Sequence, residues 1–261
     1  MKYLKLATRS IQIHLNKEFA YKADFITKII STMIADFVGP LLAIIIYNTT
    51  IGIPGWTLHE FLLFQGTLIM VLGLTKIFIL SMFWHVYEAV EEGQFHKYLL
   101  KPYNSLLFLM AISIDWQGIV EFTVGALIAS YAMSYLNINF ISFGFLFYII
   151  LILLGVLFHA AIYTMISAGS IIAVKNEALL HLFFKLTDFA RWPLTVFGIG
   201  FQIFLTFFFP IAVSAFYPVD VLLRGVSIPW LIAIILPVLA AFGISIWMWS
   251  YAIKKHTSAG G

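Results

Sequence analysis

Six long runs of apolar residues dominate this sequence and restrict the fold to one that can place them in a lipid bilayer. A helix needs roughly 20 mostly apolar residues to cross the hydrocarbon layer. The runs are Phe25–Tyr47, Phe61–Val86, Gln117–Leu136, Phe140–Val174, Pro193–Phe209 and Pro229–Ile253. Only 10% of the residues are charged, against about 25% in a soluble domain. The sequence therefore predicts an all-α integral membrane protein, with six transmembrane helices in a single domain over residues 1–261.

The distribution of basic residues predicts the orientation of these helices. Basic residues favour the cytoplasmic side of a membrane. With the N-terminus in the cytoplasm, that side would hold 13 of the 15 basic residues: Lys2, Lys5, Arg9, Lys17, Lys22, Lys28, Lys97, Lys101, Lys175, Lys185, Arg191, Lys254 and Lys255. Only Arg224 would lie outside, and Lys76 lies within the second run. We therefore expect both termini in the cytoplasm. Because the basic residues flank apolar runs, the net charge of +3 does not indicate nucleic-acid binding.

Residues 1–20 have the pattern of a helix that lies in the membrane interface. At 100° per residue, one face collects Leu4, Ala7, Ile11, Leu15 and Phe19, and the opposite face collects Lys2, Lys5, Arg9, Gln12 and Asn16. An apolar face opposite a basic one is typical of helices that lie flat on a bilayer.

The segment before the sixth run is apolar but repeatedly interrupted. Residues 207–228 contain Pro210, Pro218 and Gly225, with Phe216 and Tyr217 between the prolines. Proline removes a backbone N–H and clashes with the preceding helical turn. We expect short re-entrant helices that dip into the outer leaflet, covered by protein or lining an aqueous cavity.

Two charged residues lie inside the first two runs. Asp36 is about eleven residues from the cytoplasmic end of the first run, and Lys76 is about ten from that end of the second, so their depths agree within about 2 Å. An unpaired charge inside the membrane is costly. We therefore predict an Asp36–Lys76 ion pair, which serves either helix packing or substrate translocation or proton coupling.

Glu121 and His159 are further polar residues within the runs. Glu121 serves either helix packing or a cavity, whereas Asp115, near the interface, can reach water and is better explained as an anchor. His159 has no His or carboxylate three or four residues away, so a hydrogen bond to a neighbouring helix is a better explanation than a metal site. We retain Glu121 and His159 as candidates for a translocation path.

The sequence lacks the motifs of an enzyme that acts alone. No Gly precedes a Lys, so the phosphate-binding motif G-x-x-x-x-G-K-[ST] is absent. The hydrolase motif G-x-S-x-G and the zinc motif H-E-x-x-H are also absent, as is cysteine. We expect no catalytic residue, metal or cofactor on this chain.

The loop over residues 87–104 has an unusual composition for a connection. The stretch "EEGQFHKYLLKPYNSLL" (Glu91–Leu107), which covers most of this loop and continues three residues past it, mixes acids and bases with aromatic and aliphatic residues. Gly93 is a typical helix-ending residue, and Pro102 would end the short helix that follows. Aromatic anchors with a charged rim are typical of docking surfaces. The alternative is that the apolar side chains are buried among lipid headgroups.

The same loop resembles a signature of the six-span prokaryotic branch of ABC-2-type transporter permeases. That signature reads glycine, then basic-Tyr-Leu-Leu-basic-Pro, then Asn and Leu, and this chain has "GQFHKYLLKPYNSLL". Two further stretches are similar to the same family: "ARWPLTVF" (Ala190–Phe197) and "FFPIAVSAFYPVDVLL" (Phe208–Leu223). The order and spacing of the three agree with the family. The loop departs from it at Phe95-His96, where an acidic-basic pair is more usual.

This resemblance implies a membrane subunit of an ATP-driven exporter. The loop would be a cytoplasmic coupling helix between spans two and three that contacts a separate ATP-binding cassette subunit. The coupling surface would comprise Glu91, Glu92, Gly93, Phe95, His96, Lys97, Tyr98, Leu99 and Pro102. Lys175–Arg191 would make a lesser contact. Two ATPase copies, which hold the ATP and Mg, would serve a dimer of this permease or a pair with a related one, in a prokaryotic inner membrane.

Substrate and coupling are less constrained. The aromatic content of 17% favours a hydrophobic or amphipathic substrate only weakly, because lipid-facing helices have the same composition. One alternative is an ion-coupled secondary transporter or channel that uses Asp36, Lys76 and Glu121. Another is a non-transporting scaffold that binds partners through Glu91–Pro102.

Overall fold

Five long helices form the body of the protein. A computed structural model of the chain describes residues 9, 11–12, 20–173 and 177–256. Within them, five helices are long and apolar enough to cross a membrane, and no strand occurs. They are α2 (Lys22–Thr49), the continuous helix Leu58–Glu91, α7 (Trp116–Tyr135), α8 (Phe143–Ala173) and α12 (Ile228–Lys255). The predicted all-α membrane fold is confirmed. The interfacial helix expected over residues 1–20 falls almost entirely outside the described residues.

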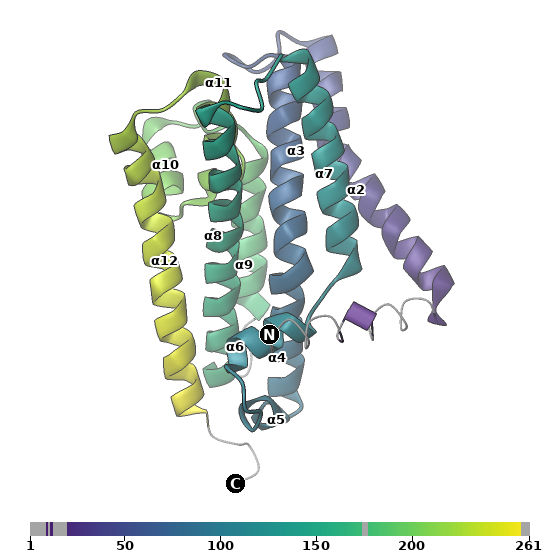
Figure 1. The fold of residues 1–261 in the computed structure, drawn as a ribbon, viewed down its shortest axis with the longest axis vertical. Helices are drawn as coiled ribbons and strands as arrows, with labels where there is room; N and C mark the ends of the chain where they lie inside the picture. Colours follow the sequence, from purple (N-terminus) through teal and green to yellow (C-terminus); the bar gives the residue numbers. More distant parts are fainter. Residues whose placement is uncertain (1–8, 10, 13–19, 174–176, 257–261) are drawn as a thin grey trace.

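The long helices run side by side, and their ends collect at two poles (Figure 1). The beginning of α2, the end of α12 and the short helix α5 (His96–Leu99) lie towards one pole. The connection between α2 and α3 and the short helix α11 (Phe216–Arg224) lie at the other. The described ends of the chain thus share one pole, as the basic residues predict.

The second long helix changes its winding partway along. It consists of α3 (Leu58–Thr75), the π-helical turn η1 (Lys76–Leu80) and α4 (Ser81–Glu91). A capping box begins it, because the Thr57 hydroxyl accepts from the Glu60 backbone N–H while the Glu60 carboxylate accepts from the Thr57 backbone N–H. It ends as the sequence predicts: Gly93 has a φ of 67°, in the left-handed region that glycine adopts readily.

Glycines bring α3 and α7 into backbone contact. A Cβ atom on Gly66 would lie 2.7 Å from the Ala129 nitrogen, and one on Gly118 would lie 2.6 Å from the Ile77 nitrogen. Gly73 and Gly125 meet the opposite helix in the same way. Small residues that let backbones approach are typical of membrane helix pairs. This contact fixes the relative height of the two helices.

Helices α12 and α11 and the turn η5 (Ile211–Ser214) pack against α8. A Cβ on Gly155 of α8 would lie 3.1 Å from the Ser214 Cα, where the turn η5 (Ile211–Ser214) crosses it. The buried Tyr148 hydroxyl shares a hydrogen bond of 2.8 Å with Thr67 of α3. Two small helices lie beside these elements: α6 (Ser105–Ile112) contacts α4, and α9 (Glu177–Thr187) contacts α8.

The fifth expected span, Pro193–Phe209, is not a single helix. It contains η3 (Leu194–Val196), α10 (Ile199–Ile203) and the π-helical turn η4 (Phe204–Phe208). The continuous piece Ile199–Phe208 is about 15 Å long at 1.5 Å per residue, half the hydrocarbon thickness. The cause is local, because Pro193 favours extended backbone at Trp192, and Gly198 is also extended.

The residues before that segment are helical. The region Lys175–Arg191, expected as a lesser ATPase contact, contains α9 (Glu177–Thr187) and the 3-10 turn η2 (Asp188–Arg191), with residues 174–176 outside the described chain. Leu180 and Phe183 of α9 are buried, and the Phe183 ring lies 5.1 Å from that of Tyr163 on α8. One apolar face of α9 thus packs into the bundle, and the ATPase contact expected for this region stays a prediction.

The interrupted segment before α12 forms short helices, as the sequence predicts. Pro210, Phe216, Tyr217 and Pro218 are all buried. The Tyr217 hydroxyl shares a hydrogen bond of 2.7 Å with Thr206, and Gly225 ends α11 with a φ of 73°. Arg224 holds this segment to the α2–α3 connection, because it donates to the Gly55 carbonyl at 2.9 Å and lies over the Trp56 ring. Its depth in a bilayer stays a prediction.

Candidate functional site

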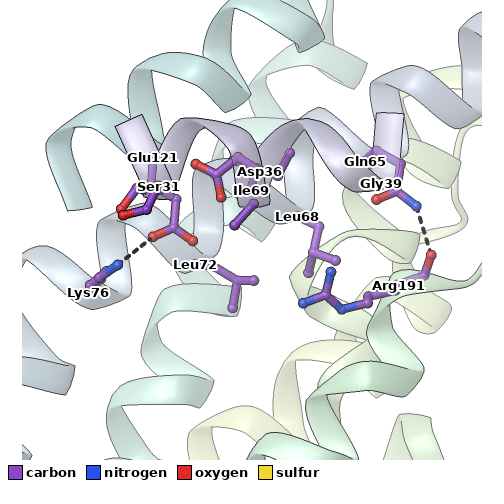
Figure 2. A pocket seen from close by; sticks show the side chains of 12 residues that line it. Ser31, Asp36, Gly39, Gln65, Leu68, Ile69, Leu72, Lys76, Glu121 and Arg191 are labelled. Atoms are coloured by element: carbon purple, nitrogen blue, oxygen red, sulfur yellow. Dashed lines mark hydrogen bonds and ion pairs between the residues drawn. The ribbon is translucent and has the colours of Figure 1, made fainter. Parts of the chain in front are cut away.

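A pocket lined by charged residues lies between α2, α3, α7 and η2. Its volume is about 350 Å³. Figure 2 shows the Lys76–Glu121 pair towards one end, Gln65 and Arg191 towards the other, and Asp36 between them. Leu68, Ile69 and Leu72 supply apolar surface on the α3 side. Charged residues at such positions in membrane helices usually mark a functional path.

Helix α2 presents one face to this pocket. Ser31, Ala35, Asp36 and Gly39 line it, with the three-to-four-residue spacing of a single helical face. At Gly39 the helices are close, because a Cβ there would lie 2.8 Å from the Gln65 side-chain oxygen. The Gln65 amide donates to the Arg191 carbonyl at 2.9 Å. Gly39 thus leaves room for the bond that ties α3 to η2.

Lys76 pairs with Glu121, not with Asp36 as the sequence predicts. The Lys76 Nζ lies 3.5 Å from the Glu121 Oε2, and these side chains are only 22% and 12% exposed. The reason is the glycine contact: Lys76 follows Gly73 by three residues, and Glu121 follows Gly118 by three. The closest helix therefore supplies the counter-ion, and the Asp36–Lys76 prediction is wrong about the partner.

Asp36 is left inside the pocket without a counter-ion. Its Oδ2 is buried and has no hydrogen-bond partner. Asp36 and Lys76 nonetheless line the same pocket. The other base, Arg191, forms an ion pair with Asp188 at 3.3 Å.

A second cavity adjoins the first across the Lys76–Glu121 pair. Its volume is about 290 Å³, and both cavities are lined by Lys76, Glu121 and Arg191. Tyr163 of α8 and Asp188 of η2 line the second cavity only. The two cavities are thus separated by a wall of charged side chains that line both. Glu121 lines both cavities and also pairs with Lys76, so both of its expected roles, in a cavity and in helix packing, fit this position.

His159 lies away from both cavities. Its ring is fully buried, 5.7 Å from that of Phe158 and 5.6 Å from that of Phe183. Its Nδ1 lies 2.9 Å from the Gly155 carbonyl within the same helix, and its Nε2 has no partner. Neither a translocation position nor the expected bond to a neighbouring helix is present. The described residues contain no cluster of three potential metal ligands.

The loop after α4 is anchored by Phe95 and exposes other side chains. Phe95 is fully buried, with its ring 6.3 Å from that of Trp249 on α12 and 5.2 Å from that of His256. It therefore anchors the loop and does not belong to an exposed coupling surface. The exposed members of the predicted surface are Glu91, Glu92, His96, Lys97 and Pro102.

The other predicted members are partly covered. Gly93, Tyr98 and Leu99 are half-buried, whereas Leu100, outside the predicted set, is 80% exposed. The Tyr98 ring lies 6.2 Å from that of Phe95. Burial, and then the carboxylates of Glu88 and Glu92, raise the pKa of the Tyr98 hydroxyl above its usual value. The tyrosine therefore remains neutral over the physiological pH range.

Backbone contacts join this loop to the pocket. The loop leads into α6 and then to Asp115, whose N–H donates to the Ile77 carbonyl of η1 at 3.1 Å. Asp115 also caps α7, because its Oδ1 accepts from the Gln117 N–H at 2.8 Å. Asp115 thus connects η1, which carries Lys76, to α7, which carries Glu121. The sequence predicts only an interfacial anchor at this position.

Sequence reasoning did not find Gln65 and Arg191 as pocket residues. Gln65 had a usable signal, since it is a lone amide in the apolar stretch "FLLFQGTLIM". Arg191 had no such signal in the sequence, because its place in the pocket depends on how the helical residues 177–191 pack in the bundle.

The fold and pocket define a multi-pass helical membrane protein built around a charged intramembrane cavity. The chain belongs to the ABC-2 transporters: the family model described as "ABC-2 family transporter protein" matches residues 31–260. This match confirms the resemblance found in the sequence and makes the chain a membrane permease of an ABC transporter. No curated protein and no solved structure gives a significant match.

Proposed function

We propose that this permease moves a hydrophobic or amphipathic substrate out of the cytoplasm, using ATP hydrolysed by a separate subunit. Membership of the ABC-2 family carries the proposal, since it implies an ABC ATPase partner, and the chain has no phosphate-binding motif of its own. In this arrangement two ATPase copies serve a permease dimer in a prokaryotic cell membrane, with both permease termini in the cytoplasm.

The exposed part of the loop is the proposed ATPase contact. Glu92, His96, Lys97 and Leu100 project from a loop that Phe95 fixes to α12. Exposed charged and apolar side chains on a rigidly anchored segment are typical of a docking surface. Movement of the loop would reach the pocket through α6 and the Asp115–Ile77 hydrogen bond.

Co-purification tests this proposal with a matched pair of substitutions. Leu100→Asp places a charge on the proposed contact, and Ile51→Asp makes the same change at a fully exposed residue near the opposite pole. The tagged chain is extracted gently and its complexes are weighed by native mass spectrometry. We expect the wild type and Ile51→Asp to retain a protein whose peptides contain a phosphate-binding motif, and Leu100→Asp to lose it. A wild-type chain that never carries such a protein contradicts the proposal.

The ion-coupled alternative is favoured by one observation, the charged residues shared by the two cavities. It requires that the purified chain alone transport a substrate down a proton or sodium gradient in vesicles. Accumulation that needs the ATPase and ATP, and that ignores the gradient, excludes it.

A further inference from the structure

We propose that the pocket beside α2 binds an organic cation with an apolar body, and that the Asp36 carboxylate is its counter-ion. The identification of this cation as the transported substrate rests on the proposed function. The binding site itself rests on the charges and shape of the pocket.

Charge pairing gives the first argument. The four ionisable residues that line the pocket are Asp36, Lys76, Glu121 and Arg191. Lys76 is paired with Glu121, and Arg191 is paired with Asp188 outside this pocket. Asp36 is therefore the lining residue without an ion pair, and its buried Oδ2 has no partner. Asp36 is half-buried, and a charge withdrawn from water inside a membrane protein is costly unless it is paired, so this site would stabilise a positive ligand.

Shape and surface give the second argument. Leu68, Ile69 and Leu72 form an apolar wall on α3 facing the Asp36 side of the pocket (Figure 2). A volume of about 350 Å³ is within the usual range for small-molecule sites, which combine an apolar wall with a few polar groups. A ligand with a hydrated cation and no apolar part would not use this wall.

Access gives the third argument. Helix α2 diverges from α3 and α7 towards its N-terminal end (Figure 1). At the closely packed end of the pocket Gly39 meets Gln65, whereas Ser31 at the other end is exposed. An amphipathic cation in the membrane can thus approach Asp36 from the Ser31 end without unfolding the bundle.

Binding of tetraphenylphosphonium and tetraphenylborate tests the inference, since the two ions are similar in shape and opposite in charge. Equilibrium dialysis is done on the full chain in detergent, without an ATPase. We expect the wild type to prefer the cation and Asp36→Asn to bind it about tenfold more weakly or worse, the range for a contact to a charged group. Asp24→Asn, on the same helix but in an exposed pair with Lys28, is expected to bind like the wild type.

Carbodiimide labelling keeps the test valid should Asp36→Asn fold poorly. In the wild-type chain, tetraphenylphosphonium is expected to slow modification of Asp36 but not of Asp24, as mapped by peptide mass spectrometry. Equal binding of the two ions, unchanged cation binding by a folded Asp36→Asn, or unprotected Asp36 each overturns the inference.

The outcomes also separate this inference from the proposed function. Cation binding that depends on Asp36 in a chain that recruits no ATPase supports the site and contradicts ATP-driven export. An ATPase complex whose chain binds neither ion at Asp36 supports the function and contradicts the site.

Discussion

The Lys76 Nζ lies 3.5 Å from the Glu121 Oε2, where the π-helical turn η1 begins. Single π-helical turns often occur at functional sites. This one lies beside the glycine contact between α3 and α7, and the Ile77 carbonyl within it accepts from the Asp115 N–H. The pair is therefore held by backbone geometry on both sides.

We expect Lys76→Met and Glu121→Gln each to cost about 2–3 kcal/mol of stability, because each leaves one largely buried partner unpaired. The double variant should cost less than the sum. Reversible unfolding in mixed detergent micelles measures the coupling energy. The exposed Asp24–Lys28 pair is the control and should show a coupling of about 0.5 kcal/mol or less. Additive effects of Lys76→Met and Glu121→Gln would show that the contact has no energetic role.

The glycine contact gives a second prediction. A Cβ at Gly73 would overlap the Phe122 backbone, so Gly73→Ala must push α7 away from α3. We expect a loss of about 1–3 kcal/mol, as for other overpacked sites. The same substitution at Gly243 of α12, where a Cβ meets nothing within 4 Å, should be neutral or slightly stabilising. Thermal unfolding of both variants measures the difference, and equal midpoints would contradict the close approach.

Phe95 should determine the position of the loop and leave the pocket unchanged. Phe95→Ala removes a fully buried ring that packs against Trp249. We expect a cost of about 3–5 kcal/mol for the contacts it makes, expressed mainly as faster hydrogen exchange over residues 91–104. Exchange in α3 and α7 should change little. Phe95→Leu, which refills most of the volume, is the control. Uniformly faster exchange would show that Phe95 supports the whole bundle.

Tyr98 gives a pH dependence with a definite sign. Burial raises its pKa above the usual value near 10, with Glu88 and Glu92 adding to the effect. The neutral Tyr98 hydroxyl is favoured in the folded state, because its pKa is higher there than in the unfolded chain. The stability that neutral Tyr98 contributes is therefore complete below about pH 10 and is lost as the pH rises through the folded-state pKa. Wild-type stability should therefore fall more steeply than that of Tyr98→Phe as the pH rises above about 10. Parallel thermal-unfolding curves over that range would contradict it.

The sequence predicted which charged residues lie near one another better than which of them pair. Counting residues placed Asp36 and Lys76 at one level, and both line one pocket. It did not predict which helix approaches most closely, although Gly66, Gly73, Gly118 and Gly125, each pair seven residues apart, carried that information. Composition predicted an apolar, aromatic loop, but the buried position of Phe95 depends on Trp249, far along the chain. Long-range packing of this kind leaves no local pattern.

Asp115 gives the last prediction, because it connects the loop to both members of the Lys76–Glu121 pair. Asp115→Ala removes the cap of α7 and should cost about 1 kcal/mol, whereas Asp115→Asn keeps a side-chain oxygen for the Gln117 N–H and should cost less. If the loop transmits ATPase movement through this point, Asp115→Ala also lowers substrate-stimulated ATP hydrolysis in the assembled complex without weakening ATPase binding. Native mass spectrometry measures binding, and phosphate release measures hydrolysis. Loss of ATPase binding in Asp115→Ala would place the residue in the docking surface, and full stimulation would show that movement reaches the pocket by another route.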